Sequence, residues 1–269
     1  MISLNKTTIN HKYFSDGALD IKIDFELLKQ GETNIIEWRF DNNEELIIVY
    51  YLARHLNTKG INEVELHMPY IPNARKDRAQ QNHHVFSLKY FSEIINSLNF
   101  KRVIALDPHS IVSEALIDRI VAITPEKCIQ AVLDKLDEST IMFYPDEGAV
   151  KRYANKTDRE FIYGMKSRDL TTREIKSLKI EGDVDRIKDH NILMVDDICS
   201  SGNTLNKAAK LLNELGAKDI YVYVSHCENT VINSDLLNNI ERLYTTNSII
   251  RAEHPKIEII ADMADLATL

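Results

Sequence analysis

The sequence predicts an α/β protein in which helices cover mainly parallel sheets. Short apolar runs of strand length alternate with segments whose apolar residues recur at helical spacing. The chain of 269 residues holds only eight glycines and six prolines, and we find no low-complexity linker or short repeat in it. Strand–helix–strand alternation is typical of parallel sheets covered by helices on both faces.

The expected elements of the first half form two helix–strand pairs. In order along the chain, they are a helix at 44–56, a strand at 64–70, a helix at 87–98 and a strand at 102–106. Each apolar run follows a helix-period segment, so neighbouring strands are expected to be parallel.

After Pro125 the same alternation resumes. The expected elements are a helix at 128–136, a strand at 140–144, a helix from Gly148, a strand at 191–195, a helix over the apolar residues 205–215 and a strand at 220–224. The helix after the strand at 191–195 is the clearest, with apolar residues at Leu205, Ala208, Ala209, Leu212 and Leu215. Gly216 is expected to end it.

Composition excludes several classes of function. A net charge of −8 and a pI near 5.6 argue against a surface for nucleic acid or anionic lipid. No apolar run is long enough to span a bilayer, and the N-terminal segment lacks the pattern of a signal peptide. Three scattered cysteines without a CxxC spacing favour a reducing compartment. We therefore expect a cytoplasmic protein that binds neither nucleic acid nor membrane.

Three strand ends carry polar residues, in the segments ALDPHS, MFYPDEG and ILMVDDICSSGNTL. Ligands of parallel α/β sheets bind beyond the carboxyl ends of the strands. These three places are therefore the candidates for a functional site.

The strongest of the three is an acidic pair followed by a turn of small residues. The apolar strand ends in Asp196 and Asp197, and the turn is formed by Ser200, Ser201, Gly202, Asn203 and Thr204. Small side chains let backbone N–H groups converge on an anion at a helix N-terminus, and paired carboxylates can accept hydrogen bonds from ribose hydroxyls. The pattern predicts a ribose-phosphate site. A simpler interpretation is that Asp and Ser merely cap the helix.

The segment VDDICSSGNTL resembles the phosphoribosyl pyrophosphate (PRPP) signature, roughly VDDxxDTGGT, of type I phosphoribosyltransferases and PRPP synthetases. Four further segments resemble synthetase motifs in the family's order: FSDGALDIKI, YIPNARKDRAQQNHHVFSLKYFSEII, RVIALDPHS and FYPDEGAVKR. MKSR followed by IEGDV is similar to the family's KxR loop and GDV. Simple transferases lack the upstream set, so the combination favours the ribose-phosphate pyrophosphokinase (PRPP synthetase) family.

This resemblance implies two tandem phosphoribosyltransferase-like (Rossmann-like) domains, roughly 1–122 and 123–269, with the active site between them. It implies that ATP and Mg²⁺ are used to transfer a diphosphate to a phosphorylated ribose. His109 and Asp146 occupy the family's magnesium positions, and Arg75 and Lys76 its ATP-contacting pair. Taken alone, His109 would be an ordinary histidine at a strand end and RKDR a solvated surface run.

Two further assignments follow from the resemblance. Lys166 and Arg168 match the cations of a mobile catalytic loop that closes over the transferred group, although this polar segment is also compatible with a surface loop. Phe14 and Asp16 match positions that bind adenine from a neighbouring subunit, which implies a homo-oligomer, a dimer or hexamer. Phe14 could instead be a core residue.

Departures from the family pattern bear on the substrate. Ala18 replaces a glutamate, and Ser200 and Asn203 replace an aspartate and a glycine of the phosphate loop. The family's regulatory stretch after the DLHA motif is also absent. Changed groups at the phosphate loop suggest a different 5-substituent, so we keep two acceptors: ribose 5-phosphate by family default, and ADP-ribose. Two different functions also compete with diphosphate transfer: a PRPP-consuming phosphoribosyltransferase and a catalytically silent nucleotide sensor.

Overall fold

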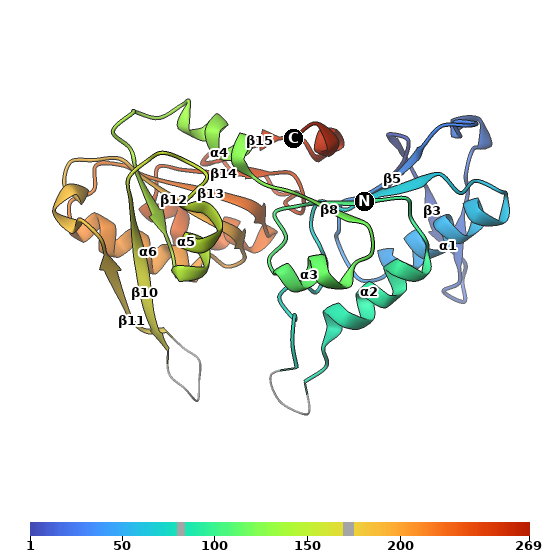
Figure 1. The fold of residues 1–269 in the computed structure, drawn as a ribbon, viewed down its shortest axis with the longest axis horizontal. Coiled ribbons are helices and arrows are strands. Elements are labelled where there is room, and N and C mark those ends of the chain that lie inside the picture. The colour runs from blue at the N-terminus through green and yellow to red at the C-terminus, as the bar shows by residue number, and fades with distance from the viewer. Residues whose placement is uncertain (80–83, 169–174) are drawn as a thin grey trace. The chain divides into compact units, whose positions relative to one another are not determined.

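The computed structural model describes residues 1–79, 84–168 and 175–269 (Figure 1). The chain forms two compact units. The N-terminal unit comprises Met1–Thr124 together with Met263–Leu269, and the C-terminal unit comprises Pro125–Asp262.

A six-stranded sheet forms the centre of the N-terminal unit, in the order β2-β1-β5-β6-β7-β8. Its strands are β1 (Ile2–Leu4), β2 (Thr7–Thr8), β5 (Asn34–Trp38), β6 (Val64–His67), β7 (Val103–Leu106) and β8 (Ile120–Ile123). The four strands from β5 to β8 are parallel, whereas β1 is antiparallel to both β2 and β5. The carboxyl ends of the parallel strands therefore share one edge of the sheet.

Helices α1 (Glu45–Thr58) and α2 (Ser87–Ser97) bury their apolar faces against this sheet. Leu52 of α1 and Phe91 of α2 join Trp38 and Leu66 in one core. The unit is completed by α3 (Ile111–Leu116), the 3₁₀ turns η1 (Phe25–Leu27) and η4 (Met263–Thr268), and a hairpin of β3 (His11–Tyr13) and β4 (Leu19–Ile21).

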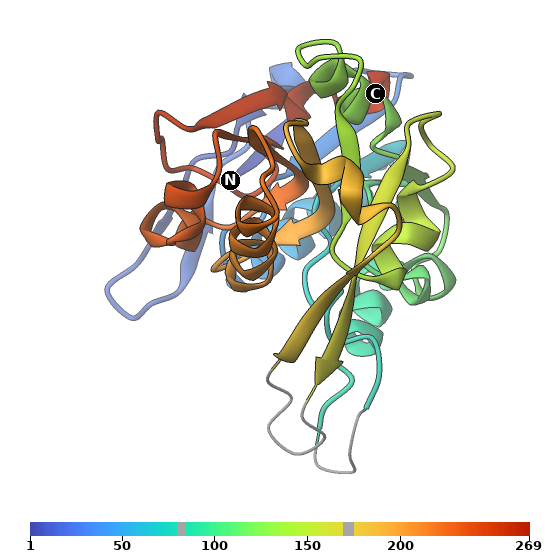
Figure 2. The ribbon, with the colours of Figure 1, turned by 90° about the vertical axis from the view of Figure 1, so that its left-hand side faces the viewer.

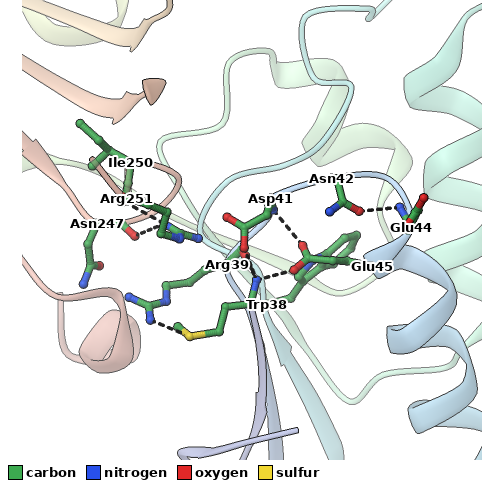
Figure 3. A network of polar contacts seen from close by, with 10 residues as sticks. Trp38, Arg39, Asp41, Asn42, Glu44, Glu45, Asn247, Ile250 and Arg251 are labelled. Atoms are coloured by element: carbon green, nitrogen blue, oxygen red, sulfur yellow. Dashed lines mark hydrogen bonds and ion pairs between the residues drawn. The ribbon is translucent and has the colours of Figure 1, made fainter. Parts of the chain in front are cut away.

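A buried carboxylate joins the end of β5 to the start of α1 (Figure 3). Glu45 Oε2 accepts the indole N–H of Trp38 at 2.9 Å and the backbone N–H of Asp41 at 2.8 Å. Beside it, the backbone N–H of Glu44 donates to Asn42 Oδ1 at 2.9 Å. Trp38 is fully buried, so Glu45 pairs an indole N–H that would otherwise be unsatisfied.

The C-terminal unit has a seven-stranded sheet, ordered β11-β10-β9-β12-β13-β14-β15. Its strands are β9 (Ile141–Tyr144), β10 (Phe161–Arg168), β11 (Ile175–Glu181), β12 (Ile192–Cys199), β13 (Ile220–Cys227), β14 (Arg242–Thr246) and β15 (Ile257–Ala261). All neighbours are parallel except β10 and β11. These two strands extend from the sheet as a two-stranded ribbon (Figures 1 and 2).

The helices of this unit are α4 (Glu126–Leu133), α5 (Glu147–Tyr153), α6 (Asn203–Glu214), α7 (Leu236–Asn239) and the 3₁₀ turns η2 (Val184–Ile187) and η3 (Asn229–Asn233). Leu205, Ala208, Ala209 and Leu212 of α6 are buried, as their spacing predicts. Gly216 follows the helix with φ +86°, a left-handed conformation that favours glycine and ends the helix.

The predicted α/β fold with mainly parallel sheets is therefore confirmed. Residues 263–269 were predicted to be part of the C-terminal domain, but the structure assigns them differently. They belong to the N-terminal unit, where η4 lies against β7 and buries Met263 and Leu266. Among the described residues, no helix combines the length and apolar character needed to cross a membrane.

Candidate ribose-phosphate and nucleotide sites

The acidic pair lies near the carboxyl end of β12. Asp197 is 4% exposed, and its Oδ2 lies 2.8 Å from Nη1 of Arg152, which comes from α5. The guanidinium of Arg152 also lies over the ring of Tyr153, 5.6 Å from its centroid. Asp197 is therefore oriented by an ion pair. Arg152 stands at the end of FYPDEGAVKR, but the sequence did not reveal that it pairs with Asp197.

The surroundings of Asp196 disfavour the ionised form of its carboxyl group. Burial raises the pKa of its carboxyl well above the ordinary value, and the nearby carboxylates of Asp197 and Asp146 raise it further. Asp146 caps the N-terminus of α5, where its side chain accepts the N–H of Ala149 at 3.0 Å. The end of β12 and the start of α5 thus place Asp146 and Asp196 close enough to interact. Such a site favours a cation or hydroxyl donors.

The turn after β12 needs a glycine at position 202. Gly202 has φ +71°, and a Cβ there would lie 3.0 Å from both Leu236 Cδ2 and Ser234 Oγ. Asn203 begins α6, and Ser201 and Asn203 are exposed. The first N–H groups of a helix have no intrahelical carbonyl partner, so this turn offers donors to an anion.

Ser200 makes a contact that the sequence did not predict. Its hydroxyl donates to Glu228 Oε2 at 2.6 Å, so its proton points at a carboxylate in this structure. Glu228 follows β13, and its backbone N–H donates to Cys199 O at 2.8 Å. The predicted strand at 220–224 ended too early to place Glu228 at a strand end; the observed strand continues to Cys227.

In the N-terminal unit, the structure joins two of the predicted nucleotide-binding segments. Ser110 Oγ donates to Asp77 Oδ2 at 2.8 Å, which connects the loop of Arg75 and Lys76 to the loop of His109. Arg75 and Lys76 are exposed, and His109 is half-buried. Both loops follow carboxyl ends of parallel strands, β6 and β7, where ligands of such sheets bind.

The predicted adenine-binding residues lie at the tip of the β3–β4 hairpin. Phe14 is 55% exposed, so it is not a core residue, and Lys12 Nζ lies 5.9 Å from its ring centroid. Asp16 accepts the backbone N–H of Ala18 at 2.9 Å and thereby supports the turn. An exposed ring on a hairpin is well placed to contact another molecule.

The predicted catalytic loop is partly strand. Lys166 and Arg168 belong to β10, where they are opposite Leu178 and Ile175 of β11. The polar character of 165–176 predicts a loop, but backbone pairing with β11 extends β10 to Arg168. Residues 169–174 lie outside the described part of the chain.

No group of three or more His, Cys, Asp or Glu side chains is placed to enclose a metal ion within the described ranges. Mg²⁺ seldom needs such a cage, because it is commonly held by one or two carboxylates together with substrate phosphates and water. Asp146 beside Asp196 fits that kind of site. His109, the second predicted ligand, belongs to the N-terminal unit.

Comparisons with known proteins bear on the fold and on the sequence relationship of the chain. Residues 151–235 match the phosphoribosyl transferase domain. Proteins named ribose-phosphate pyrophosphokinase from Helicobacter hepaticus and Pyrococcus furiosus are 28% and 27% identical; each match covers 97% of this chain, and 85% and 92% of those proteins. The crystal structure of phosphoribosylpyrophosphate synthetase from Mycobacterium smegmatis has the same fold, with a TM-score of 0.77 and 18% identity over 97% of this chain and 87% of that one. The chain is therefore similar, over most of its length, to proteins named ribose-phosphate pyrophosphokinase.

Proposed function

We propose that the chain transfers the β,γ-diphosphate of ATP to the anomeric hydroxyl of a 5-phosphorylated ribose and releases AMP. The observation that carries this proposal is the end of β12, where an oriented acidic pair precedes a glycine-dependent turn at the start of α6. Homology to proteins named ribose-phosphate pyrophosphokinase supports the reaction type.

On the ribose side, Asp196 and Asp197 accept hydrogen bonds from the two ribose hydroxyls. The backbone N–H groups of residues 201–204 bind the 5-phosphate, together with the side chains of Ser201, Asn203 and Thr204. The helix N-terminus contributes partial positive charge to the same anion. Arg152 holds Asp197 in position and limits the mutual repulsion of the two carboxylates.

On the ATP side, Arg75, Lys76 and His109 contact the nucleotide from the two loops joined by Asp77 and Ser110. Asp146, and His109 by the resemblance of its segment, would hold Mg²⁺, directly or through water, and the ion would neutralise phosphate charge. Phe14 and Asp16 complete the adenine site of a neighbouring subunit in a dimer or hexamer.

Diphosphoryl transfer depends chiefly on alignment and on neutralising charge. The anomeric oxygen forms a bond to the β-phosphorus, and the bond from that phosphorus to the α–β bridging oxygen breaks. AMP leaves with the bridging oxygen, and the hydroxyl proton passes to solvent. Lys166 and Arg168 stabilise the charge on the transferring group, and closure of their ribbon excludes water that would hydrolyse ATP.

Two acceptors fit the proposal. Ribose 5-phosphate is the acceptor that the relatives' name indicates. ADP-ribose also has a free anomeric hydroxyl, but its 5-phosphate is esterified and carries one charge fewer. The Ser200–Glu228 contact at the phosphate turn is the specific observation in favour of this second acceptor.

Incubation with Mg-ATP and either sugar, followed by phosphorus NMR and AMP measurement, tests the proposal. AMP and a new sugar-linked diphosphate are expected, and the sugar that yields them is the acceptor. Consumption of PRPP with a nucleobase, without the first reaction, would identify a phosphoribosyltransferase instead. Nucleotide binding without any turnover would identify a sensor.

A further inference from the structure

The contact between Ser200 and Glu228 changes what the phosphate turn offers a ligand. A serine hydroxyl has one proton to donate, and this proton points at Glu228 over 2.6 Å. Ionised carboxylates only accept hydrogen bonds. At this edge of the turn, Ser200 and Glu228 therefore present acceptor oxygens, whereas the backbone N–H groups at the start of α6 present donors.

Glu228 is held in place by the backbone as well as by Ser200. Its N–H donates to Cys199 O at 2.8 Å, across the parallel pairing of β12 and β13, in which Cys199 is opposite Cys227. The carboxylate thus stands beside the turn as part of the sheet end. Its side chain does not cap η3, so its charge can be changed without removing a helix cap.

Acceptor oxygens discriminate between the two kinds of 5-phosphate. A phosphate monoester carries nearly two negative charges at neutral pH and offers only acceptor oxygens, which a neighbouring carboxylate repels. A phosphate diester carries one charge, and the group attached to it can bring hydroxyl donors. The backbone N–H donors at the start of α6 suit both ligands. The acceptor oxygens of Ser200 and Glu228 suit only the phosphate diester.

We propose that Glu228, acting with Ser200, selects a ribose whose 5-phosphate is esterified to a hydroxyl-bearing group over a ribose with a 5-phosphate monoester. This inference rests on the proposed function and names the substrate class of the same site. Glu228 is then a specificity-determining residue that directly follows β13, outside the turn itself.

The test compares wild type with Glu228→Gln and Ser200→Ala, using ribose 5-phosphate and ADP-ribose as probes. Glu228→Gln keeps the shape and removes the charge. We expect it to lower the ratio of kcat/KM for ADP-ribose to that for ribose 5-phosphate about tenfold, with the KM for ATP unchanged. Ser200→Ala should move the ratio in the same direction. Glu241→Gln, an exposed carboxylate at the opposite end of the strands, is the matched control.

Direct binding of each sugar by calorimetry, without ATP, separates the two proposals. Loss of discrimination in Glu228→Gln supports the inference even where turnover is slow. An unchanged preference in both assays, with the variant folded by circular dichroism, would overturn the role of Glu228 and leave the diphosphokinase intact. Sugar binding without AMP release in wild type would overturn the proposed function alone, because selection by Glu228 is still read from the affinities.

Discussion

At the scale of single residues, the carboxyl group of Asp196, which we propose binds the ribose, also affects the stability of the folded protein. Its pKa is raised in the folded protein from the ordinary 3.8 by burial and by Asp197 and Asp146. A group with a raised folded-state pKa contributes stability that is complete below the unfolded-state value and is lost as the pH rises through the folded-state value. The ionised carboxylate therefore destabilises the ligand-free protein at neutral pH.

We expect Asp196→Asn to raise the Tm of the ligand-free protein at pH 7 by about 3 °C, and this gain to disappear near pH 4. The substitution keeps the oxygen that accepts the Asp197 N–H at 3.0 Å. Calorimetric melting between pH 4 and 8 measures the effect, with the exposed Asp185→Asn as control. A Tm below wild type at every pH would contradict the raised pKa. Ribose affinity should fall in the same variant.

Glu45 supports a second prediction at this scale. Glu45→Ala leaves the buried indole N–H of Trp38 unpaired, and we expect a loss of about 1–3 kcal/mol in the free energy of unfolding. Trp38 is the only tryptophan, so its fluorescence reports the unfolding directly. The neighbouring Glu44 is exposed, and Glu44→Ala is expected to change stability little. Equal losses in both variants would mean that the indole contact contributes nothing.

Local motifs limit what the sequence predicts about single residues. Asp196 and Asp197 could be recognised because an apolar strand runs directly into them. The partners Arg152 and Glu228 could not, because they come from α5 and from the end of β13 and meet the motif only after the sheet forms. Long-range partners of this kind leave no local pattern.

At the scale of elements, the two ends of α6 depend on glycine for different reasons. Gly202 and Gly216 both have positive φ, so alanine strains the backbone at either position by about 1 kcal/mol or more. Only Gly202 belongs to the proposed phosphate turn. A Cβ there would lie 3.0 Å from Ser234 Oγ, whereas a Cβ at Gly216 would lie 3.3 Å from Lys188 Cγ.

We expect Gly202→Ala and Gly216→Ala to lower the Tm, but only Gly202→Ala to raise the KM for the sugar acceptor, by about tenfold or more. Steady-state kinetics with both variants at saturating Mg-ATP measures the difference. A similar rise in KM for both would show that general loosening of α6 is sufficient, and it would argue against a role for the turn geometry.

Elements with strong periodicity were predicted well, and those defined by pairing were not. The α6 helix was located by its apolar spacing and by Gly216. The strand before it was predicted to end at residue 195, but β12 continues through Asp196 and Asp197 to Cys199, because pairing with β13 overrides the polar side chains. The ribbon of β10 and β11 was not predicted, for the same reason. A polar segment indicates a loop unless the strand that pairs with it is known.

At the scale of the whole molecule, each unit places its candidate residues at the carboxyl ends of its own parallel strands. Asp77, Ser110 and His109 stand there in the N-terminal unit, and Asp197 and Glu228 in the C-terminal one. One architectural rule thus accounts for the positions of both the candidate nucleotide-binding and the candidate ribose-binding residues. The exposed Phe14 is the exception, since it lies in the turn of the antiparallel β3–β4 hairpin and does not follow a parallel strand.

The exception leads to a prediction about assembly. If Phe14 serves a neighbouring subunit while Lys166 serves its own, then Phe14→Ala and Lys166→Ala damage opposite halves of a shared site. Alone, Phe14→Ala is expected to lose most of its kcat/KM for ATP, and Lys166→Ala most of its kcat. In a mixed dimer, one of the two sites receives its hairpin from the Lys166→Ala subunit and its lysine from the Phe14→Ala subunit, and that site is intact.

Random mixing after subunit exchange should therefore restore roughly a quarter of wild-type activity in a dimer. Activity is measured as AMP release, with mass determination by light scattering to confirm that the mixed species form. Mixing Phe14→Ala with Gly202→Ala provides the matched comparison, because it too combines a hairpin defect with a defect in the subunit's own site. Mixed species without recovered activity would mean that Phe14 acts within its own chain, and the inter-subunit adenine site would have to be abandoned.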